Sequence, residues 1–275
     1  MVLERVPQKG LAARSSTDLK KTESQIPTRL DLAGTWIDQP YVSQYAPGWA
    51  ITISLEPTFE VRDRCGLSTS TRNMIRKIWP YHLPNMDPEM LAKLVFCFEN
   101  DPERHDGFIS GAQDSIGICI PGLCRHYYNN RFWPEKIETC YDEEILNWLE
   151  SHLVMIPMEP RKPACSVVGG KVSTLAKVKA LAKAADVCWE AIMRRDLGAF
   201  AKAYADSFNA QVAMFPGMIQ GCVPSYIEKY EKLVLAYKMP GAGGGGYLAC
   251  VVDDADAFCE EHSEAFKLTI RRPGM

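Results

Sequence analysis

The sequence predicts a mixed fold of helices and strands, either α/β or α+β, and two observations support this prediction. Short apolar runs typical of strands occur in both halves of the chain. Between them lie longer segments whose apolar residues recur every three or four positions, which is helical spacing. Elements that alternate in this way build mixed folds, and 275 residues allow one large domain or two smaller ones.

Three strands are expected early in the chain, after a polar arm of about 26 residues that shows no periodicity. Glu56 and Pro57 form the expected turn between the last two of these strands. The strands cover residues 29–33, 49–55 and 58–63.

Two helices are expected next. Hydroxyl residues at 68–71 precede the first helix, which stops at Pro80, and the second helix runs from about 88 to 98. The apolar run after Asp114 fits either a helix or a strand.

The second half begins after a weak break in composition near residues 145–165. Its expected elements are a strand in 151–159, a helix over 175–192, a helix capped by Asp196, a strand in 247–254 and a closing helix in 254–266.

The charge balance excludes some classes of partner. The 31 Lys and Arg residues against 34 Asp and Glu residues give a net charge of −3, too balanced for a non-specific nucleic-acid or membrane-surface binder. An apolar fraction of 47% and a charged fraction of 24% are typical of a globular protein and exclude disorder and collagen-like structure. The beginning of the sequence lacks the apolar stretch of a signal peptide, so we expect a cytoplasmic protein.

Cysteine and histidine give no sign of a metal centre or of a thiol nucleophile. The ten cysteines form no CxxC pair, and the five histidines are scattered, so we expect reduced, mostly buried thiols and no zinc site. The residues are Cys65, Cys97, Cys119, Cys124, Cys140, Cys165, Cys188, Cys222, Cys250 and Cys259, with His82, His105, His126, His152 and His262.

The segment PTRLDLAGTWIDQP, residues 27–40, could present charged groups to a ligand. Arg29 and Asp31 share one face of the expected strand, and Asp38 lies just beyond the turn at Gly34. An ordinary surface strand with polar positions explains the same residues.

The segment CGLSTST, residues 65–71, could form an anion cradle at the start of a helix, where backbone N–H groups and the helix dipole favour a phosphate. A simple helix cap fits as well. The spacing and the lysine of the Walker A motif are absent.

Two further features are open to two readings. Five of the six residues from Gly241 are glycine, which indicates a close approach of backbone, although a hinge or a turn would also explain them. Asp114 lies in SGAQDSIG between a glycine turn and an apolar run, where it could be a catalytic base or a helix cap.

Four motifs in this order resemble the GHMP kinase superfamily, named for galactokinase, homoserine kinase, mevalonate kinase and phosphomevalonate kinase. The opening segment is most similar to the fucokinase and heptose-phosphate kinase branch, and GLSTST is similar to the family's phosphate loop. SGAQDSIG looks like the family's aspartate motif, and KMPGAGGGGYL, residues 238–248, looks like its glycine-rich third motif. The resemblance covers about residues 27–255.

The resemblance implies an α+β, two-lobed fold and a kinase. The N-terminal lobe, 27–150, would be ribosomal-protein-S5-like and would follow the arm at 1–26. The C-terminal lobe, 151–275, would be ferredoxin-like. The implied activity is transfer of the γ-phosphoryl group of ATP to a hydroxyl of a sugar or sugar phosphate, by a monomer or a homodimer that uses Mg²⁺.

The resemblance also implies roles for individual residues. Asp114 matches the carboxylate that takes the proton from the acceptor hydroxyl, and Arg29 the basic residue that stabilises that carboxylate and the phosphoryl group. Asp38 and Gln113 would bind the acceptor.

The nucleotide would be bound by the phosphate loop and the glycine-rich motif, and Mg²⁺ by a hydroxyl and a carboxylate. Ser70 would face the metal, with Glu99 as the carboxylate or Glu103 as the alternative. The nucleotide-binding residues would be Gly66, Leu67, Ser68, Thr69, Ser70, Thr71, Gly243 and Gly244.

The sequence departs from the family pattern around the phosphate loop. Ser68 replaces the second glycine, Arg62 to Arg64 stand where Pro-x-Gly is usual, and only residues 39–65 separate Asp38 from Gly66. Thr35 replaces a glycine of the opening motif. The alternative interpretation is therefore a sugar- or nucleotide-binding protein of this fold with weak or no kinase activity.

Overall fold

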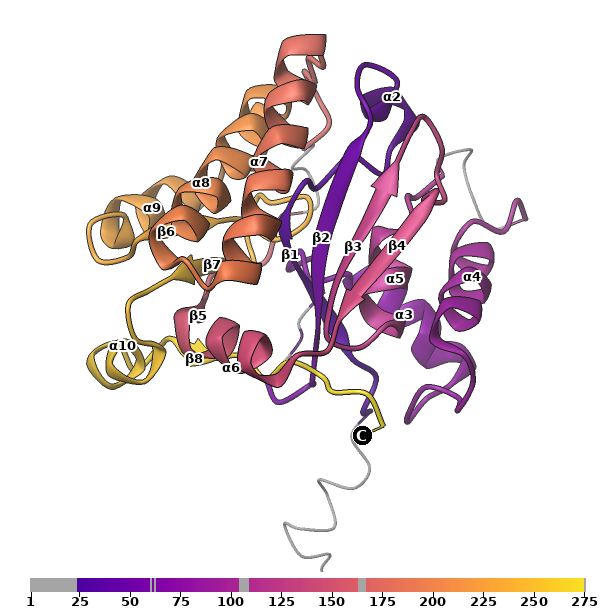
Figure 1. Cartoon of the computed structure of the whole chain (residues 1–275), viewed down its shortest axis with the longest axis horizontal. Coiled ribbons are helices and arrows are strands. Elements are labelled where there is room, and N and C mark those ends of the chain that lie inside the picture. The colour runs from indigo at the N-terminus through magenta and orange to yellow at the C-terminus, as the bar shows by residue number, and fades with distance from the viewer. Residues whose placement is uncertain (1–23, 60, 62, 104–108, 163–166, 275) are drawn as a thin grey trace, which may run out of the picture.

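The computed structural model describes residues 24–59, 61, 63–103, 109–162 and 167–274. Except for residues 24–26, the expected N-terminal arm lies outside this range, as do Arg62, His105 and Cys165. The described residues form two four-stranded antiparallel sheets with helices packed around them (Figure 1). The α+β class expected from the sequence is confirmed.

The first sheet has the order β1-β2-β3-β4. Its strands are β1 (Thr28–Ala33), β2 (Gly48–Leu55), β3 (Leu123–Tyr128) and β4 (Lys136–Cys140). All six residues of β1 are buried because α5 packs against it, as do α7 and α8 of the second half of the chain (Figure 1). Polar side chains on β1 are therefore held inside the protein and need internal partners.

The connections from β1 to β2 and from β2 to β3 contain helices, whereas β3 and β4 are joined by a short non-helical segment. These helices are α2 (Pro40–Ser43), α3 (Thr69–Ile78), α4 (Pro88–Glu99) and α5 (Gln113–Cys119). The Asp87 side chain caps α4 by accepting the N–H of Met90 at 2.8 Å. The apolar run after Asp114, which fitted either element, forms α5 first and then β3.

The prediction of a strand over residues 58–63 is wrong for those of its residues that the structure describes. Residues 57–59, 61 and 63 are irregular, because Phe59 packs against the second sheet instead of pairing with β2. Its ring centroid lies 4.8 Å from that of Phe266 and 6.0 Å from that of Tyr247.

The second sheet has the order β6-β7-β5-β8. Its strands are β5 (Leu153–Pro157), β6 (Ala236–Lys238), β7 (Tyr247–Val251) and β8 (Phe266–Lys267). The helices of this half are α6 (Glu143–His152), α7 (Leu175–Arg194), α8 (Leu197–Met214), α9 (Val223–Tyr230) and α10 (Ala255–Glu261), with a 3₁₀ turn, η1 (Pro216–Met218). Asp196 caps α8 as the sequence predicts, because its carboxylate accepts the N–H of Ala199 at 3.0 Å.

The two sheets are joined through backbone as well as through helix packing. The C-terminal segment returns to the first sheet, where Arg271 donates its N–H to Ser54 O and accepts the N–H of Gly122, both at 2.8 Å. The two sheets lie on either side of residue 150, but the division into lobes at 27–150 and 151–275 stays a prediction. In the described part of the chain, no helix combines the length and apolar character needed to cross a bilayer.

Candidate active site

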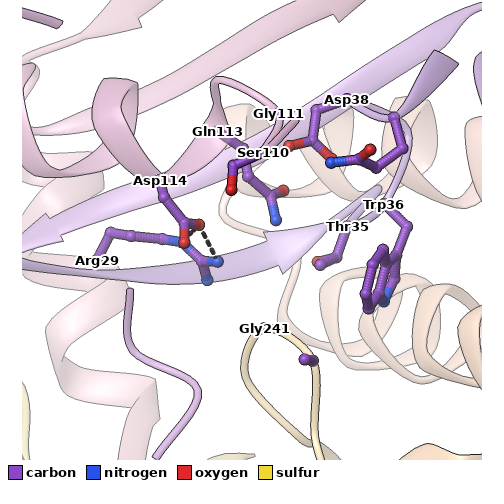
Figure 2. A pocket seen from close by; sticks show the side chains of 11 residues that line it. Arg29, Thr35, Trp36, Asp38, Ser110, Gly111, Gln113, Asp114 and Gly241 are labelled. Carbon is purple, nitrogen blue, oxygen red and sulfur yellow. Dashed lines mark hydrogen bonds and ion pairs between the residues drawn. The ribbon is translucent and has the colours of Figure 1, made fainter. Parts of the chain in front are cut away.

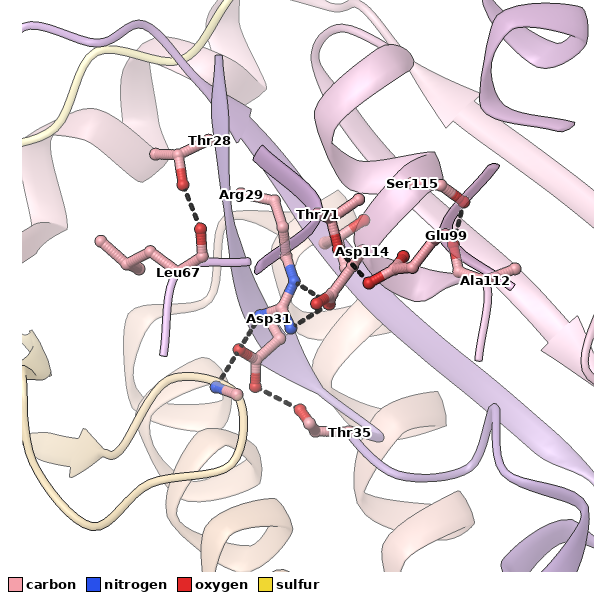
Figure 3. Close-up of polar contacts among 12 residues, drawn as sticks. Thr28, Arg29, Asp31, Thr35, Leu67, Thr71, Glu99, Ala112, Asp114 and Ser115 are labelled. Carbon is pink, nitrogen blue, oxygen red and sulfur yellow. Dashed lines mark hydrogen bonds and ion pairs between the residues drawn. The ribbon is translucent and has the colours of Figure 1, made fainter. Parts of the chain in front are cut away.

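Arg29 of β1 and Asp114 of α5 form a buried ion pair (Figures 2 and 3). Arg29 donates from Nε to Asp114 Oδ1 at 2.9 Å and also from Nη2 to the same oxygen. Its side chain is 2% exposed, whereas that of Asp114 is 24% exposed. The Asp114 carboxylate is therefore partly exposed at the surface of a cavity, whereas the Arg29 side chain that binds it lies inside the protein.

Asp31 completes an internal charge network behind this pair (Figure 3). It accepts hydrogen bonds from Arg29 Nη1, from Lys238 Nζ and from the Thr35 hydroxyl. It also accepts the backbone N–H of Gly241 at 2.7 Å. Residues from β1, β6 and the glycine-rich loop are thus tied to one carboxylate.

The network favours the charged forms of Asp31 and Arg29 despite their burial, whereas burial of Lys238 outweighs its pairing with Asp31 and lowers the pKa of that lysine. Burial alone would raise the pKa of Asp31, but Lys238 and Arg29 outweigh it and lower that pKa below its ordinary value. Burial likewise opposes the charge of Arg29, but Asp114 and Asp31 outweigh it and raise its pKa. The site therefore holds a permanent guanidinium next to Asp114.

Sequence reasoning singled out Arg29, Asp31 and Asp114 but missed Lys238 as a site residue. Lys238 is completely buried, and it also donates to the Thr35 hydroxyl at 3.2 Å. A signal was present, because a lysine at the end of an apolar run and directly before the glycine-rich loop needs an internal partner.

A cavity of about 150 Å³ opens beside Asp114 (Figure 2). It is lined by Arg29, Thr35, Trp36, Asp38, Gln39, Ser110, Gly111, Gln113, Asp114, Gly241 and Ala242. The structure therefore brings together the four residues assigned by resemblance to catalysis and acceptor binding, which are Arg29, Asp38, Gln113 and Asp114.

Asp38 is held in the cavity wall by its surroundings. Its carboxylate accepts the backbone N–H of Gln113, and a side chain on Gly111 would place its Cβ 1.9 Å from Asp38 Oδ2. Burial, and then the charge of Asp114, raise the pKa of Asp38 to about 7. Asp38 thus both lines the cavity and holds the start of the helix that carries Asp114.

The candidate phosphate loop, residues 65–71, leads directly into α3. Gly66 has φ +81°, Ser68 is left-handed with φ 57°, and α3 follows without a side-chain cap. The Ser68 hydroxyl is buried with no hydrogen-bond partner among the described residues. Uncapped N–H groups at a helix start suit an anion.

The candidate metal residues differ in their placement. Glu99 Oε1 accepts the hydroxyl of Thr71 at 2.7 Å, and burial followed by the charge of Asp114 raises the pKa of Glu99 to about 8. Ser70 is exposed on the first turn of α3, and Glu103 is exposed in the segment that follows α4. Within the described ranges, no three His, Cys, Asp or Glu side chains are grouped to hold a metal ion.

The glycines of the third motif lie close to backbone atoms, as expected. These atoms belong to other segments of this protein. A Cβ on Gly66 would lie 2.2 Å from Pro240 O, one on Gly241 would lie 2.5 Å from Gly66 O, and one on Gly246 would lie 2.2 Å from the Cα of Cys65. The phosphate loop and the glycine-rich loop are therefore packed against each other.

Gly243 and Gly244 already use their N–H groups within the protein. Gly243 donates to Pro240 O at 3.2 Å, and Gly244 donates to Met218 O at 2.9 Å. Their assignment to the nucleotide stays a prediction.

Comparison with known proteins identifies the fold. No protein-family model matches the sequence, and no curated protein matches it. Among solved structures, Methanococcus jannaschii mevalonate kinase is similar with a TM-score of 0.62 at 14% identity, over 90% of this chain and 98% of that one. Lactococcus lactis galactokinase in complex with galactose is similar with a TM-score of 0.59 at 14% identity, over 90% and 93%.

Streptococcus pneumoniae phosphomevalonate kinase in complex with phosphomevalonate and AMPPNP is similar with a TM-score of 0.59 at 11% identity, over 88% of this chain and 98% of that one. These three structures span almost the whole chain. The chain has the fold of the GHMP kinase superfamily, as the four motifs predict.

Proposed function

We propose that this chain, with the fold of GHMP kinases, is a small-molecule kinase that transfers the γ-phosphoryl group of ATP to a hydroxyl of a sugar or sugar phosphate. The observation that carries the proposal is the Arg29–Asp114 pair in the wall of a polar cavity. Gly241 connects this cavity to the phosphate loop, because it lines the cavity and packs against Gly66. An acceptor and a triphosphate bound at these two places would be neighbours.

The chemistry needs positioning and charge neutralisation more than covalent help. The acceptor hydroxyl oxygen attacks the γ-phosphorus, the bond from that phosphorus to the bridging oxygen breaks, and ADP leaves with the bonding electrons. Asp114 accepts the hydroxyl proton, and Arg29 stabilises both the carboxylate and the charge on the phosphoryl group. An aspartate is a weak base at neutral pH, so proton transfer comes late, as the new oxygen–phosphorus bond forms.

The phosphate loop supplies what a triphosphate needs. The first N–H groups of α3 favour phosphate oxygens, and the Ser68 hydroxyl, which has no partner in the part of the chain that the structure describes, can donate to one. A hydroxyl and a carboxylate suit Mg²⁺, which binds one or two carboxylates together with phosphates and water. Ser70 and Glu99 would hold the ion, and Glu99 is preferred to Glu103 because it lies against Thr71 of the loop. When bound, Mg²⁺ supplies neutralisation of the phosphate charge.

A protein of this fold that binds ligands without transfer is the second candidate. It is favoured by the tight packing of Gly66 against the glycine-rich loop and by the internal use of the Gly243 and Gly244 N–H groups. These contacts leave less free backbone for a triphosphate.

Thermal unfolding with ATP and Mg²⁺, together with ADP release over a panel of sugars, separates the two candidates. A kinase shows a higher Tm with ATP–Mg²⁺ and ADP release that depends on the sugar. A rise in Tm without ADP release for any acceptor would favour the binding protein.

A further inference from the structure

We propose that the acceptor is an uncharged polyol, a single sugar unit that carries no phosphate or carboxylate. This inference rests on the proposed phosphotransfer function and names the substrate class of the same cavity.

The first argument is the charge of the cavity lining. Among the described lining residues, the ionisable side chains are one cation, Arg29, and two carboxyl groups, Asp38 and Asp114. The raised pKa of Asp38, about 7, leaves its carboxyl group partly protonated at neutral pH. Arg29 is already shared between Asp114 and Asp31. No second cation from the described part of the chain lines the cavity, so an anionic acceptor would meet carboxylates without a counter-ion of its own.

The nearest buried ammonium does not change this balance. Lys238 lies behind Asp31 and is paired with it, and it is not part of the lining. The positive charge of Lys238 is therefore compensated by Asp31 inside the protein and is not available to a ligand in the cavity.

The second argument is a pair of buried polar atoms in the lining. Trp36 Nε1, a donor, and Gln113 Oε1, an acceptor, have no hydrogen-bond partner among the described residues. Buried polar atoms without partners are costly, and a hydroxyl can both donate and accept. Hydroxyl groups can donate to Gln113 Oε1 and accept from Trp36 Nε1, whereas a phosphate dianion placed at these two residues could not donate to Gln113. This part of the cavity therefore favours the hydroxyl groups of a ligand over a phosphate group.

The third argument is size. At about 150 Å³ the cavity is smaller than the pockets that hold drug-sized ligands, typically about 300–1,000 Å³. Its wall cannot simply recede, because Gly111 is packed against Asp38, and Trp36 is stacked on Phe215 with 4.5 Å between ring centroids. One sugar ring is the size of ligand that this wall favours.

Isothermal titration calorimetry without nucleotide tests the inference directly. The panel contains common hexoses, deoxyhexoses and heptoses, each beside its 1-phosphate and its 6- or 7-phosphate, with mevalonate as a carboxylate probe. At least one neutral sugar should bind, and each of its phosphates should bind at least ~10-fold more weakly, the scale on which rejected isosteres differ. Tighter binding of a phosphate than of its parent sugar, or binding of charged probes alone, would overturn the inference.

A charge placed in the lining provides an independent check. Gln39 is buried in the cavity wall, so Gln39→Lys adds an ammonium there, and Gln39→Met is the control of similar length without charge. Gln39→Lys should reduce the ratio of the affinity for the sugar to the affinity for its phosphate at least ~10-fold, the effect of about 1.4 kcal/mol. Gln39→Met should leave this ratio unchanged. Equal ratios in both variants would contradict the role given to charge.

ADP release measured on the same panel keeps this inference separate from the kinase proposal. Sugar-dependent ADP release only with phosphorylated sugars would leave the kinase standing and overturn the uncharged acceptor. Tight binding of a neutral sugar without any ADP release would leave the uncharged ligand standing and contradict the kinase.

Discussion

Lys238 donates a hydrogen bond to Asp31 across 207 positions of the chain, inside the protein and without contact with solvent. Asp31 is in turn bound to Arg29, which holds Asp114. The second sheet thus contributes a positioning residue to a site whose acid–base group lies in the first half of the chain.

Removing the ammonium of Lys238 should destabilise the protein strongly. Lys238→Met leaves the buried Asp31 with Arg29 as its one remaining cation, and breaking a buried ion pair costs about 3–5 kcal/mol. Urea unfolding measures this loss. Lys202→Met is the control, because its exposed pair with Asp206 should contribute at most about 1 kcal/mol.

The double variant Asp31→Asn/Lys238→Met tests whether the charges themselves matter. The uncompensated charge of Asp31 is then absent, so part of the lost stability should return, although Arg29 keeps only Asp114 as a charged partner. A double variant as unstable as Lys238→Met would show that the packing of the lysine stem, not the ion pair, stabilises this region.

Asp38→Ala should weaken binding of the acceptor and leave binding of the nucleotide unchanged. Hydrogen bonds to a charged group contribute about 1.5–3 kcal/mol, so the KM for the acceptor should rise at least ~10-fold. Steady-state kinetics measures this, and calorimetry with ATP–Mg²⁺ is the control. Because Asp38 also accepts the N–H of Gln113, kcat should fall as well. Loss of nucleotide affinity instead would contradict the assignment of Asp38 to the acceptor.

Asp38 should also make stability depend on pH. Its pKa is about 7 in the folded protein and about 3.9 in an unfolded chain, so the folded state retains a proton that the unfolded state releases. The free energy of unfolding should therefore fall as pH rises from about 4 to about 7, by at most about 1.4 kcal/mol per pH unit.

Urea unfolding of wild type and of Asp38→Asn over this range isolates the contribution, with the exposed Asp253→Asn as control. The free energy of unfolding should fall less steeply with pH in Asp38→Asn than in wild type, and Asp253→Asn should behave like wild type. Parallel pH profiles for all three proteins would contradict the raised pKa.

Ser70→Ala should weaken ATP–Mg²⁺ binding without affecting the fold. Ser70 is exposed at the start of α3, where a change away from packing alters stability by no more than about 0.5 kcal/mol. Calorimetry with ATP in the presence and absence of Mg²⁺ should show a loss only when Mg²⁺ is present. The same loss of affinity in both conditions would contradict the assignment of Ser70 to the metal site.

Much of the fold could be predicted because local signals agreed with tertiary packing. β1, β2 and the helices that begin behind Asp87 and Asp196 carry their own periodicity and caps. Residues 58–63 could not be predicted, because the contacts of Phe59 with Tyr247 and Phe266, which lie far later in the chain, decide their conformation.

The site was predictable in its motifs but not in its internal contacts. Arg29 and Asp114 follow from motif resemblance, whereas the pairing of Lys238 with Asp31 needs the topology of two sheets. The glycines at 66 and 241 mark a close approach, but sequence does not tell whether a ligand or another loop approaches. Because Gly66→Val would collide with Pro240, that variant is expected to disturb the fold and is a poor test of nucleotide binding.

Transfer of labelled γ-phosphate from ATP to a sugar in a single turnover, in wild type and in Asp114→Asn, tests the proposed kinase most directly. The substituted amide would keep the shape of the side chain and lose the proton acceptor, so the rate constant for transfer should fall at least ~10²-fold while the affinity for the sugar barely changes. Labelled sugar formed by wild type, and formed at least ~10²-fold more slowly by Asp114→Asn, is the predicted result. Equal rates in the two proteins, or no labelled sugar from wild type with any acceptor that binds, would contradict a kinase that uses Asp114 as its base.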